Sequence, residues 1–243
     1  MELIRPDWNI LPQVQVATTT RLGGISKPPY DSLNLGDHVD DHPAAVIENR
    51  ERMLSALGVE RAQWLTQVHG VRCVEAKADG RVREADACWT DEENLACIVM
   101  TADCLPVVMT DGERVLAAHA GWRGLANGVL EASLSYFHNK PNLHVWLGPA
   151  IGPLAFEVGE EVRERFCDHN PQATECFLPA LHHGKWLADL YELARLRLFE
   201  QGVQHVSGGD LCTFSDKRRF FSYRRDIHTG RMATVIWKPP LNK

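Results

Sequence analysis

Three short segments carry the side chains best suited to chemistry, each at the end of an apolar run with glycine, proline or an acid beside it. They are Gln67–Gly70, which contains His69, Thr101–Pro106, which contains Asp103 and Cys104, and Ala118–Gly124, which contains His119. Adjacent strands of one sheet could bring these distant residues together. Two imidazoles and a thiolate would then form three ligands that suit Zn²⁺ and leave a fourth position open for water.

The same residues also have a plainer interpretation. A single histidine at a strand end is more often a hydrogen-bonded core or surface residue, and a cysteine that follows an aspartate is often simply buried. Spacing alone does not decide between the two. A metal centre at His69, Cys104 and His119 is therefore a hypothesis at this point.

Apolar patterning predicts the elements that must position these segments. Strands are predicted over 13–19, 64–68, 71–75, 85–90, 95–100, 105–110, 114–119, 143–147, 203–207, 220–223 and 232–237. Helices are predicted over 43–57, 124–137, 157–167 and 185–201, and a long loop over 21–30. Because the strands cluster instead of alternating with helices, we expect an α+β fold with mixed β-sheets and flanking helices, as one compact domain over residues 1–243.

Composition limits the partners and the compartment. A chain of 243 residues with a net charge of -6 has no basic field to attract nucleic acid, so a small-molecule substrate is expected. No apolar run is long enough to cross a bilayer and no secretion signal opens the chain, so a cytoplasmic location without membrane contact is predicted. Seven cysteines without CxxC spacing are interpreted as reduced thiols. The oligomeric state stays open.

Taken together, seven segments resemble the bacterial YfiH, or laccase-domain, family over nearly the whole chain. They are residues 20–26, 29–36, 67–70, 101–106, 118–124, 147–153 and 221–226. The resemblance implies a fold related to the catalytic domain of cytotoxic necrotizing factor toxins, and a zinc site at His69, Cys104 and His119. Cu²⁺ could occupy the same ligands. The 11 histidines include no His-x-His pair of the kind that multicopper oxidases use, so laccase activity is not favoured.

The resemblance implies purine nucleoside chemistry. Two reactions are expected: phosphorolysis of adenosine, inosine, guanosine or methylthioadenosine to base and ribose 1-phosphate, and deamination of adenosine. Deamination needs a metal-activated water and a proton carrier, for which Asp103 is the candidate beside Cys104 and His119, although an aspartate at a strand-end turn is as often a local hydrogen-bond acceptor.

Phosphorolysis needs cationic or backbone donors for phosphate. Arg123, at the start of a predicted helix, is the first candidate for this role, and Arg21 is the second. Trp122 and Tyr223 could stack on a purine, but aromatic residues at such places more often pack in the core. The remaining expected substrate contacts are Asn34, Gln67 and Arg224.

Three alternatives remain open. The branch of the family that the chain resembles most, called peptidoglycan editing factor, implies an amidase that removes L-serine from the precursor UDP-MurNAc-L-Ser. The toxin relationship suggests a thiol hydrolase with Cys104 as nucleophile and His119 as base, although a thiolate cannot easily both bind zinc and attack. A binding or assembly factor is the alternative without catalysis.

Overall fold

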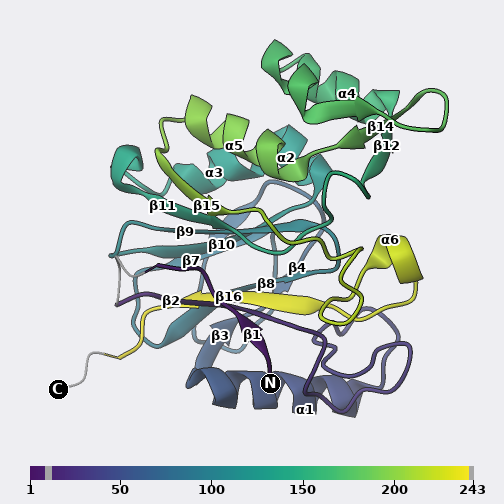
Figure 1. Cartoon of the computed structure of the whole chain (residues 1–243). Helices are drawn as coiled ribbons and strands as arrows, with labels where there is room; N and C mark the ends of the chain where they lie inside the picture. Colours follow the sequence, from purple (N-terminus) through teal and green to yellow (C-terminus); the bar gives the residue numbers. More distant parts are fainter. Residues whose placement is uncertain (9–12, 241–243) are drawn as a thin grey trace.

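Two mixed β-sheets lie face to face in the middle of the structure, and helices cover both outer faces (Figure 1). The structure is a computed structural model that describes residues 1–8 and 13–240. One sheet has the order β1 (Leu3–Ile4), β2 (Gln15–Thr19), β16 (Met232–Trp237), β8 (Leu95–Thr101), β3 (Arg61–Gln63). The other has the order β15 (His205–Gly208), β11 (His144–Leu147), β9 (Leu105–Thr110), β10 (Val115–Ala120), β7 (Ala87–Thr90), β5 (Cys73–Glu75). The predicted fold class is confirmed.

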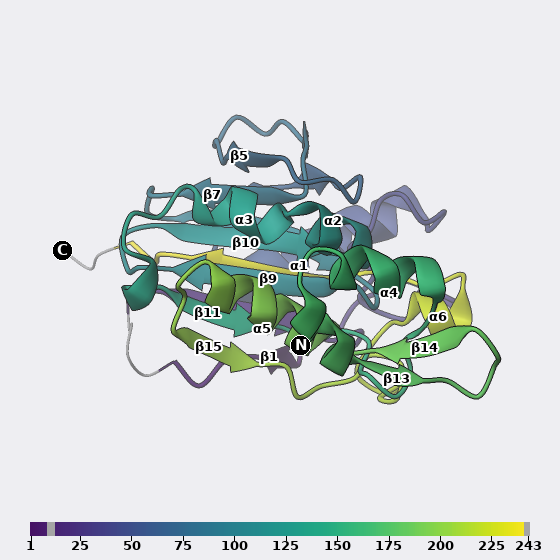
Figure 2. The same cartoon turned by 90° about the horizontal axis from the view of Figure 1, so that it is seen from above.

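Helices form the outer layers. Three of them cover the six-stranded sheet (Figure 2), namely α2 (Trp122–Asn127), α3 (Val129–Leu134) and α5 (Leu190–Glu200), while α1 (Pro43–Leu57) covers the five-stranded sheet. The smaller elements are β4 (Leu65–Thr66), β6 (Arg83–Glu84), β12 (Glu157–Gly159), α4 (Glu160–Cys167), β13 (Phe177–Pro179), β14 (Lys185–Ala188), α6 (Tyr223–Asp226) and the 3-10 turns Lys140–Asn142 and Pro171–Cys176. Among the described residues, no helix combines the length and apolar character needed to span a membrane.

Strand β8 shows how the sequence builds these layers. Leu95, Cys97 and Val99 pack between the two sheets. The alternate residues Ala96, Ile98 and Met100 pack toward α1. Because side chains alternate along a strand and both faces of β8 are covered, the strand is an unbroken apolar run. Each fully buried Leu, Ile or Val contributes roughly 1.5–3 kcal/mol to folding, so this strand anchors the loop that follows it.

The helix predicted over 43–57 has the bounds of α1. Pro43 lies in its first turn, and Gly58 ends it in the left-handed conformation with φ 65°. The single helix predicted over 124–137 is wrong, because the structure divides this region into α2 and α3. The break is at Gly128, whose φ of 101° lies outside the helical region.

The helix predicted over 185–201 begins too early. Lys185–Ala188 forms β14, which pairs with both β12 and β13. Helix α5 starts only after Asp189, whose carboxylate accepts hydrogen bonds from the backbone N–H groups of Tyr191 and Glu192. This side-chain cap satisfies two amides that have no partner inside the helix, and so fixes where the helix begins.

In two further segments the type of element differs from the prediction. The first residues of the helix predicted over 157–167 form strand β12, and α4 begins at Glu160. The strand predicted over 220–223 is a loop that leads into α6. Here the Ser222 hydroxyl accepts a hydrogen bond from the N–H of Arg225, which caps the short helix.

Candidate metal centre

The three predicted ligand residues meet at one end of the six-stranded sheet. Cys104 immediately precedes β9, and His119 lies near the end of β10. Since these strands are antiparallel neighbours, with Leu105 opposite Ala120, both residues reach the same edge. His69 comes from the loop after β4.

The ligand atoms of His69, Cys104 and His119 all lie within 4.8 Å of one another. Cys104 Sγ is 3.7 Å from His69 Nε2. The two imidazole rings have centroids 4.7 Å apart and meet edge to face. The structure therefore brings the three side chains into one cluster, at distances that a single ion could bridge.

The backbone around the cluster is tightly constrained. His69 has φ 59° and Asp103 has φ 89°, and such left-handed conformations cost about 1–3 kcal/mol each in a residue with a side chain. Gly121 leaves room for the ligands, because a Cβ at this position would lie 2.8 Å from His69 Cδ2 and 3.1 Å from Cys104 Sγ. A larger residue at Gly121 would displace the cluster.

A buried carboxylate, Asp86, holds two of the ligands. Its Oδ1 accepts hydrogen bonds from His119 Nδ1 and from the N–H of His69, both at 2.9 Å. Its Oδ2 accepts the N–H groups of Gly70 at 2.7 Å and Val68 at 3.2 Å. Because Nδ1 of His119 is engaged, its Nε2 is the nitrogen left for a ligand.

Sequence reasoning missed Asp86. It is an acid between the alanines Ala85 and Ala87, directly before β7, and no motif or spacing marked it. Burial raises the pKa of its carboxyl, but the hydrogen bonds from His119 and the loop amides outweigh burial and leave the pKa below its ordinary value. Asp86 is therefore a charged acceptor inside the protein.

The charges of Cys104 and His119 support each other. Burial disfavours the thiolate, yet the positive charge of His119 and hydrogen bonds from both histidines lower the pKa of Cys104 to about 6. Burial likewise disfavours the imidazolium, while Cys104 and Asp86 raise the pKa of His119 to about 9. The thiolate is thus favoured at neutral pH, which is the form that binds metals.

These residues fit a divalent transition metal. One thiolate and two imidazoles are the ligands that such ions prefer, and the Asp86 carboxylate behind His119 is the partner that orients a ligating histidine. Three protein ligands leave a coordination position free, as in catalytic sites. The residues that would hold the metal are His69, Cys104 and His119.

Asp103 is bound on both carboxylate oxygens. Thr213 Oγ1 donates to Oδ1 at 2.6 Å, while Ser222 Oγ and the N–H of Arg224 donate to Oδ2 at 3.0 Å and 2.7 Å. These bonds tie the segment before β16 to the residue next to Cys104. They are the contacts of an anchoring carboxylate, and a role for Asp103 in proton transfer stays a prediction.

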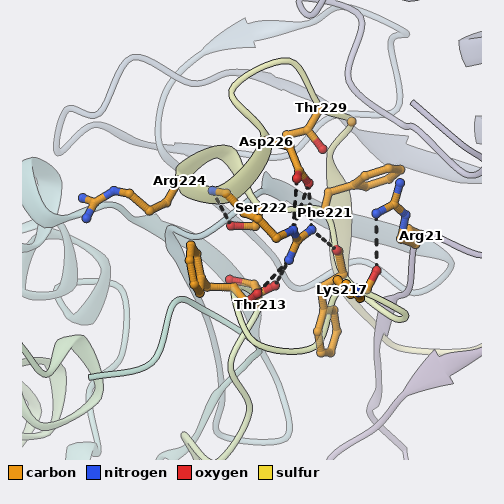
Figure 3. A network of polar contacts seen from close by, with 12 residues as sticks. Arg21, Thr213, Lys217, Phe221, Ser222, Arg224, Asp226 and Thr229 are labelled. Atoms are coloured by element: carbon orange, nitrogen blue, oxygen red, sulfur yellow. Dashed lines mark hydrogen bonds and ion pairs between the residues drawn. The ribbon is translucent and has the colours of Figure 1, made fainter. Parts of the chain in front are cut away.

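Arg21 lies in the predicted long loop with its guanidinium fixed to the chain. Nε donates to the carbonyl of Asp31 at 2.9 Å, and Nη1 donates to the carbonyl of Lys217 at 3.3 Å (Figure 3). The guanidinium carbon lies 4.7 Å from the centre of the Phe221 ring. These contacts hold the loop in place, and a direct contact with substrate stays a prediction.

Asn34 and Gln67 also use their amides within the protein. Buried Asn34 donates to the carbonyl of Gly36 at 3.0 Å and accepts the N–H of Arg231 at 2.9 Å. Gln67 exchanges two hydrogen bonds with the backbone of Met100, at 2.8 Å and 2.7 Å. Both residues connect the loops of the centre to β8 and β16, and substrate contact remains a prediction for each.

Trp122 and Arg123 begin α2 directly after Gly121. The half-buried Trp122 packs on the core beneath the helix. The exposed Arg123 places its guanidinium 4.5 Å from the centre of the Trp122 ring. Its side chain forms no hydrogen bond or ion pair with another residue in the part of the chain that is described. Arg123 is thus a cation with capacity to bind an anion.

Tyr223 and Arg224 lie on α6. Tyr223 is 55% exposed. Arg224 donates from Nη1 to the carbonyl of Glu157 at 2.8 Å and lies over the Phe156 ring, at 5.4 Å. The phenol ring of Tyr223 is therefore accessible, while the guanidinium of Arg224 connects α6 to β12.

A second residue that sequence reasoning missed is Arg231. It is half-buried, donates from Nη1 to the carbonyls of Thr229 and Gly230, and lies 5.9 Å from the ring of Tyr223. Burial lowers the pKa of its guanidinium, and the negative charge of Cys104 acts in the opposite direction, so the two groups interact. The feature of the sequence that could have pointed to Arg231 is its position directly before the strand predicted over 232–237. In the structure, Met232 of β16 pairs with Thr101 at the end of β8, close in sequence to Cys104.

Comparison with known proteins places this chain in a family. The sequence profile described as "Multi-copper polyphenol oxidoreductase laccase" matches residues 15–239. A purine nucleoside phosphorylase of Pseudomonas aeruginosa is 54% identical over 96% of this chain and 97% of its own. The purine nucleoside phosphorylase YfiH of Escherichia coli K12 is 49% identical over 97% of this chain and 98% of its own.

A crystal structure of a Neisseria meningitidis protein superposes with a TM-score of 0.94 at 46% identity, and covers 98% of this chain and 100% of that chain. Profile, relatives and fold agree over nearly the whole length. The chain therefore belongs to the YfiH, or laccase-domain, family.

Proposed function

We propose that this chain is a metal-dependent purine nucleoside phosphorylase. The observation that carries the proposal is the agreement between full-length relatives of that name and the cluster of His69, Cys104 and His119. In this reaction an oxygen of phosphate bonds to C1′ of the nucleoside while the bond from C1′ to the purine nitrogen breaks. The electron pair goes to the base, which takes up a proton, and ribose 1-phosphate is released.

The residues at the centre have different roles in this reaction, which follow from their chemistry. A divalent metal bound there supplies Lewis acidity. The hydrogen bond to Asp86 fixes the orientation of the His119 ring, so this ligand need not reorient as charge develops on the substrate. We expect Arg123 and Arg231 to hold phosphate, and the accessible ring of Tyr223 to offer a stacking surface for the purine.

We propose zinc as the metal and adenosine deamination as a second reaction of the same centre. Two histidines and one cysteine suit zinc, and the free coordination position suits a hydrolytic reaction. Polyphenol oxidation by a multicopper enzyme has less support, because it would need several metal sites. Within residues 1–8 and 13–240, this cluster is the single group of three or more His, Cys, Asp or Glu side chains that could hold a metal.

Metal analysis and product analysis of one preparation test the proposal. The purified protein is expected to hold about one zinc per chain, and inosine plus phosphate should give hypoxanthine and ribose 1-phosphate. Cys104→Ser should reduce kcat/KM at least about a hundredfold, whereas Cys176→Ser, remote from the cluster, should not. Release of L-serine from UDP-MurNAc-L-Ser without phosphorolysis would overturn the proposal in favour of the amidase.

A further inference from the structure

A positively charged pocket lies beside the loop predicted over residues 21–30. It has a volume of about 460 Å³ and is lined by Arg21, Leu22, Asp31, Lys217, Arg218, Arg225 and Asp226. Four of these residues are basic and two acidic, which gives the pocket a formal charge of +2 in a chain of net charge -6. Such a local reversal of charge attracts small anions without attracting nucleic acid to the whole surface.

The pocket and the metal centre are on opposite sides of one segment. Ser222 has extended backbone (φ -140°, ψ 118°), so its side chain and that of Phe221 point in opposite directions. Ser222 donates to Asp103, beside the metal ligand Cys104, whereas Phe221 lies under the guanidinium of Arg21 in the pocket. Figure 3 shows the guanidinium of Arg21 on one side of this segment.

Part of the pocket is a rigid wall. Arg225 donates to the carbonyls of Thr213, Phe214 and Phe220 and pairs with Asp226 at 2.8 Å. Like Arg21, it uses its hydrogen bonds within the protein. Arg21 is paired in the same way with Asp31, at 3.4 Å. Within each of these two ion pairs the charges offset one another, so the net charge of +2 comes from the remaining two cations of the pocket.

The other two cations are free to bind a ligand. Lys217 and Arg218 are exposed, and across the described ranges the side chain of neither forms a hydrogen bond or ion pair. The charge of Arg218 interacts with that of Asp216 at longer range. An ammonium and a guanidinium that line the same pocket suit a group that carries two or more negative charges on several oxygens.

We propose that this pocket binds the phosphate groups of a small phosphate ester or diphosphate, at a site separate from the metal centre. The pocket is open to solvent, and its volume exceeds the needs of a single inorganic phosphate. The exposed Leu22 at its edge supplies an apolar contact for the organic part of an ester. The site does not depend on the reaction proposed for the metal centre.

Calorimetric titration of the full chain with pyrophosphate and with adenosine monophosphate tests the proposal. Both are expected to bind, and Lys217→Gln combined with Arg218→Gln should weaken binding about tenfold. The matched control is Lys185→Gln, which removes an exposed lysine on β14, and it should leave the affinity within twofold. Higher salt should weaken binding to the wild type more than to the double variant.

Two results would overturn the proposal. One is equal affinity in the wild type and the double variant, or equal loss in the Lys185→Gln control. The other is binding of inorganic phosphate alone, with the double variant raising only the KM for phosphate, because the pocket would then belong to the reaction centre. Since binding is measured without nucleoside, an inactive protein that still binds pyrophosphate would contradict the proposed function and leave this site standing.

Discussion

The carboxylate of Asp86 accepts a 2.9 Å hydrogen bond from Nδ1 of His119 while it also accepts the backbone N–H of His69. One buried group thus fixes a ligand side chain from a strand and a ligand backbone from a loop. The loop could not move away from the strand without leaving a buried carboxylate unpaired, which is costly. This link explains how residues 50 positions apart, His69 and His119, keep one geometry.

Asp86→Asn should therefore weaken metal binding about 10- to 100-fold. The asparagine side chain would turn its NH₂ group, a donor, toward backbone N–H groups that need an acceptor. Competition with a metal chelator measures the affinity. Asp79→Asn, which removes an exposed partner of Arg83, is the control and should leave it unchanged. An unaltered metal affinity in Asp86→Asn would show that His119 is held by other contacts.

Gly121→Ala should disrupt the centre without straining the backbone. Gly121 has φ -59°, so alanine is allowed there, but its Cβ would lie 2.8 Å from the His69 ring. We expect reduced metal content in the purified protein. In Gly80→Ala, where the space is open but φ is +72°, metal content should stay full while stability falls by roughly 1 kcal/mol. Full metal content in both variants would contradict the packing argument.

The thiol of Cys104 should react as a thiolate at neutral pH once the metal is removed. Its pKa of about 6 means that alkylation by iodoacetamide should rise with pH with a midpoint at about 6 and level off above it. His119→Gln removes the stabilising positive charge, so the midpoint should move up toward the ordinary thiol value. Mass spectrometry of the Cys104 peptide measures the rate. A midpoint near 9 in the wild type would contradict the assigned charge pairing.

The ligands could be predicted from sequence, but what holds them could not. Cys104 and His119 lie at the ends of the paired strands β9 and β10, so strand pairing suggested that they meet, and the family resemblance implied the full set. His69 follows β4, which pairs with β6 in a separate two-stranded sheet, so strand pairing does not account for its place in the cluster. Asp86 gave no local signal, because its partners are one side chain and three amides that only the folded loop brings to it.

The same limit explains the errors in the elements. The spacing of Leu187, Leu190, Ala194 and Leu198 fits a helix, yet Leu187 belongs to β14 because β12 and β13 pair with it. Tertiary pairing overrides local periodicity in such short segments. In the sequence, Gly128 and Asp189 are each compatible with a helix interior and with a helix end, and only the folded structure distinguishes the two.

The cysteines outside the cluster should be dispensable for chemistry. Cys88 and Cys97 are fully buried between the sheets, so alanine at either position should cost about 1 kcal/mol in thermal or denaturant unfolding. Turnover per folded molecule should match the wild type, and the same holds for Cys73 and Cys176. Loss of turnover without loss of stability in any of the four would place that thiol in the reaction.

Cys212 is the cysteine outside the cluster whose role in the reaction most needs a direct test. Its sulfur accepts the N–H groups of Gly152 at 3.2 Å and Ser215 at 3.4 Å. Burial raises its pKa, but these hydrogen bonds outweigh burial and lower it. Cys212→Ser keeps an acceptor at the same place, so we expect a folded and active protein. A folded but inactive Cys212→Ser variant, checked by circular dichroism and by phosphorolysis, would identify a further residue of the site.

The roles of phosphate binding and metal binding can be separated at Arg123. If Arg123 holds the attacking phosphate, Arg123→Ala should raise the phosphate KM or abolish phosphorolysis, while adenosine deamination, which uses no phosphate, should fall much less. His119→Ala should damage both reactions, because it removes a shared ligand. The guanidinium of Arg123 stacks only on Trp122 and has no carboxylate partner among the residues described, so its loss should leave the metal in place.

Arg231 gives the contrasting case, and metal analysis of each variant distinguishes the two arginines. Its guanidinium bonds to backbone carbonyls and interacts with the charge of Cys104, so Arg231→Ala should lower stability as well as both reactions. A selective loss of phosphorolysis in Arg123→Ala with full metal content would assign the phosphate to Arg123. A parallel loss of both activities with depleted metal would instead make Arg123 a support for the loop after His119, and Arg231 would become the cation that meets the phosphate.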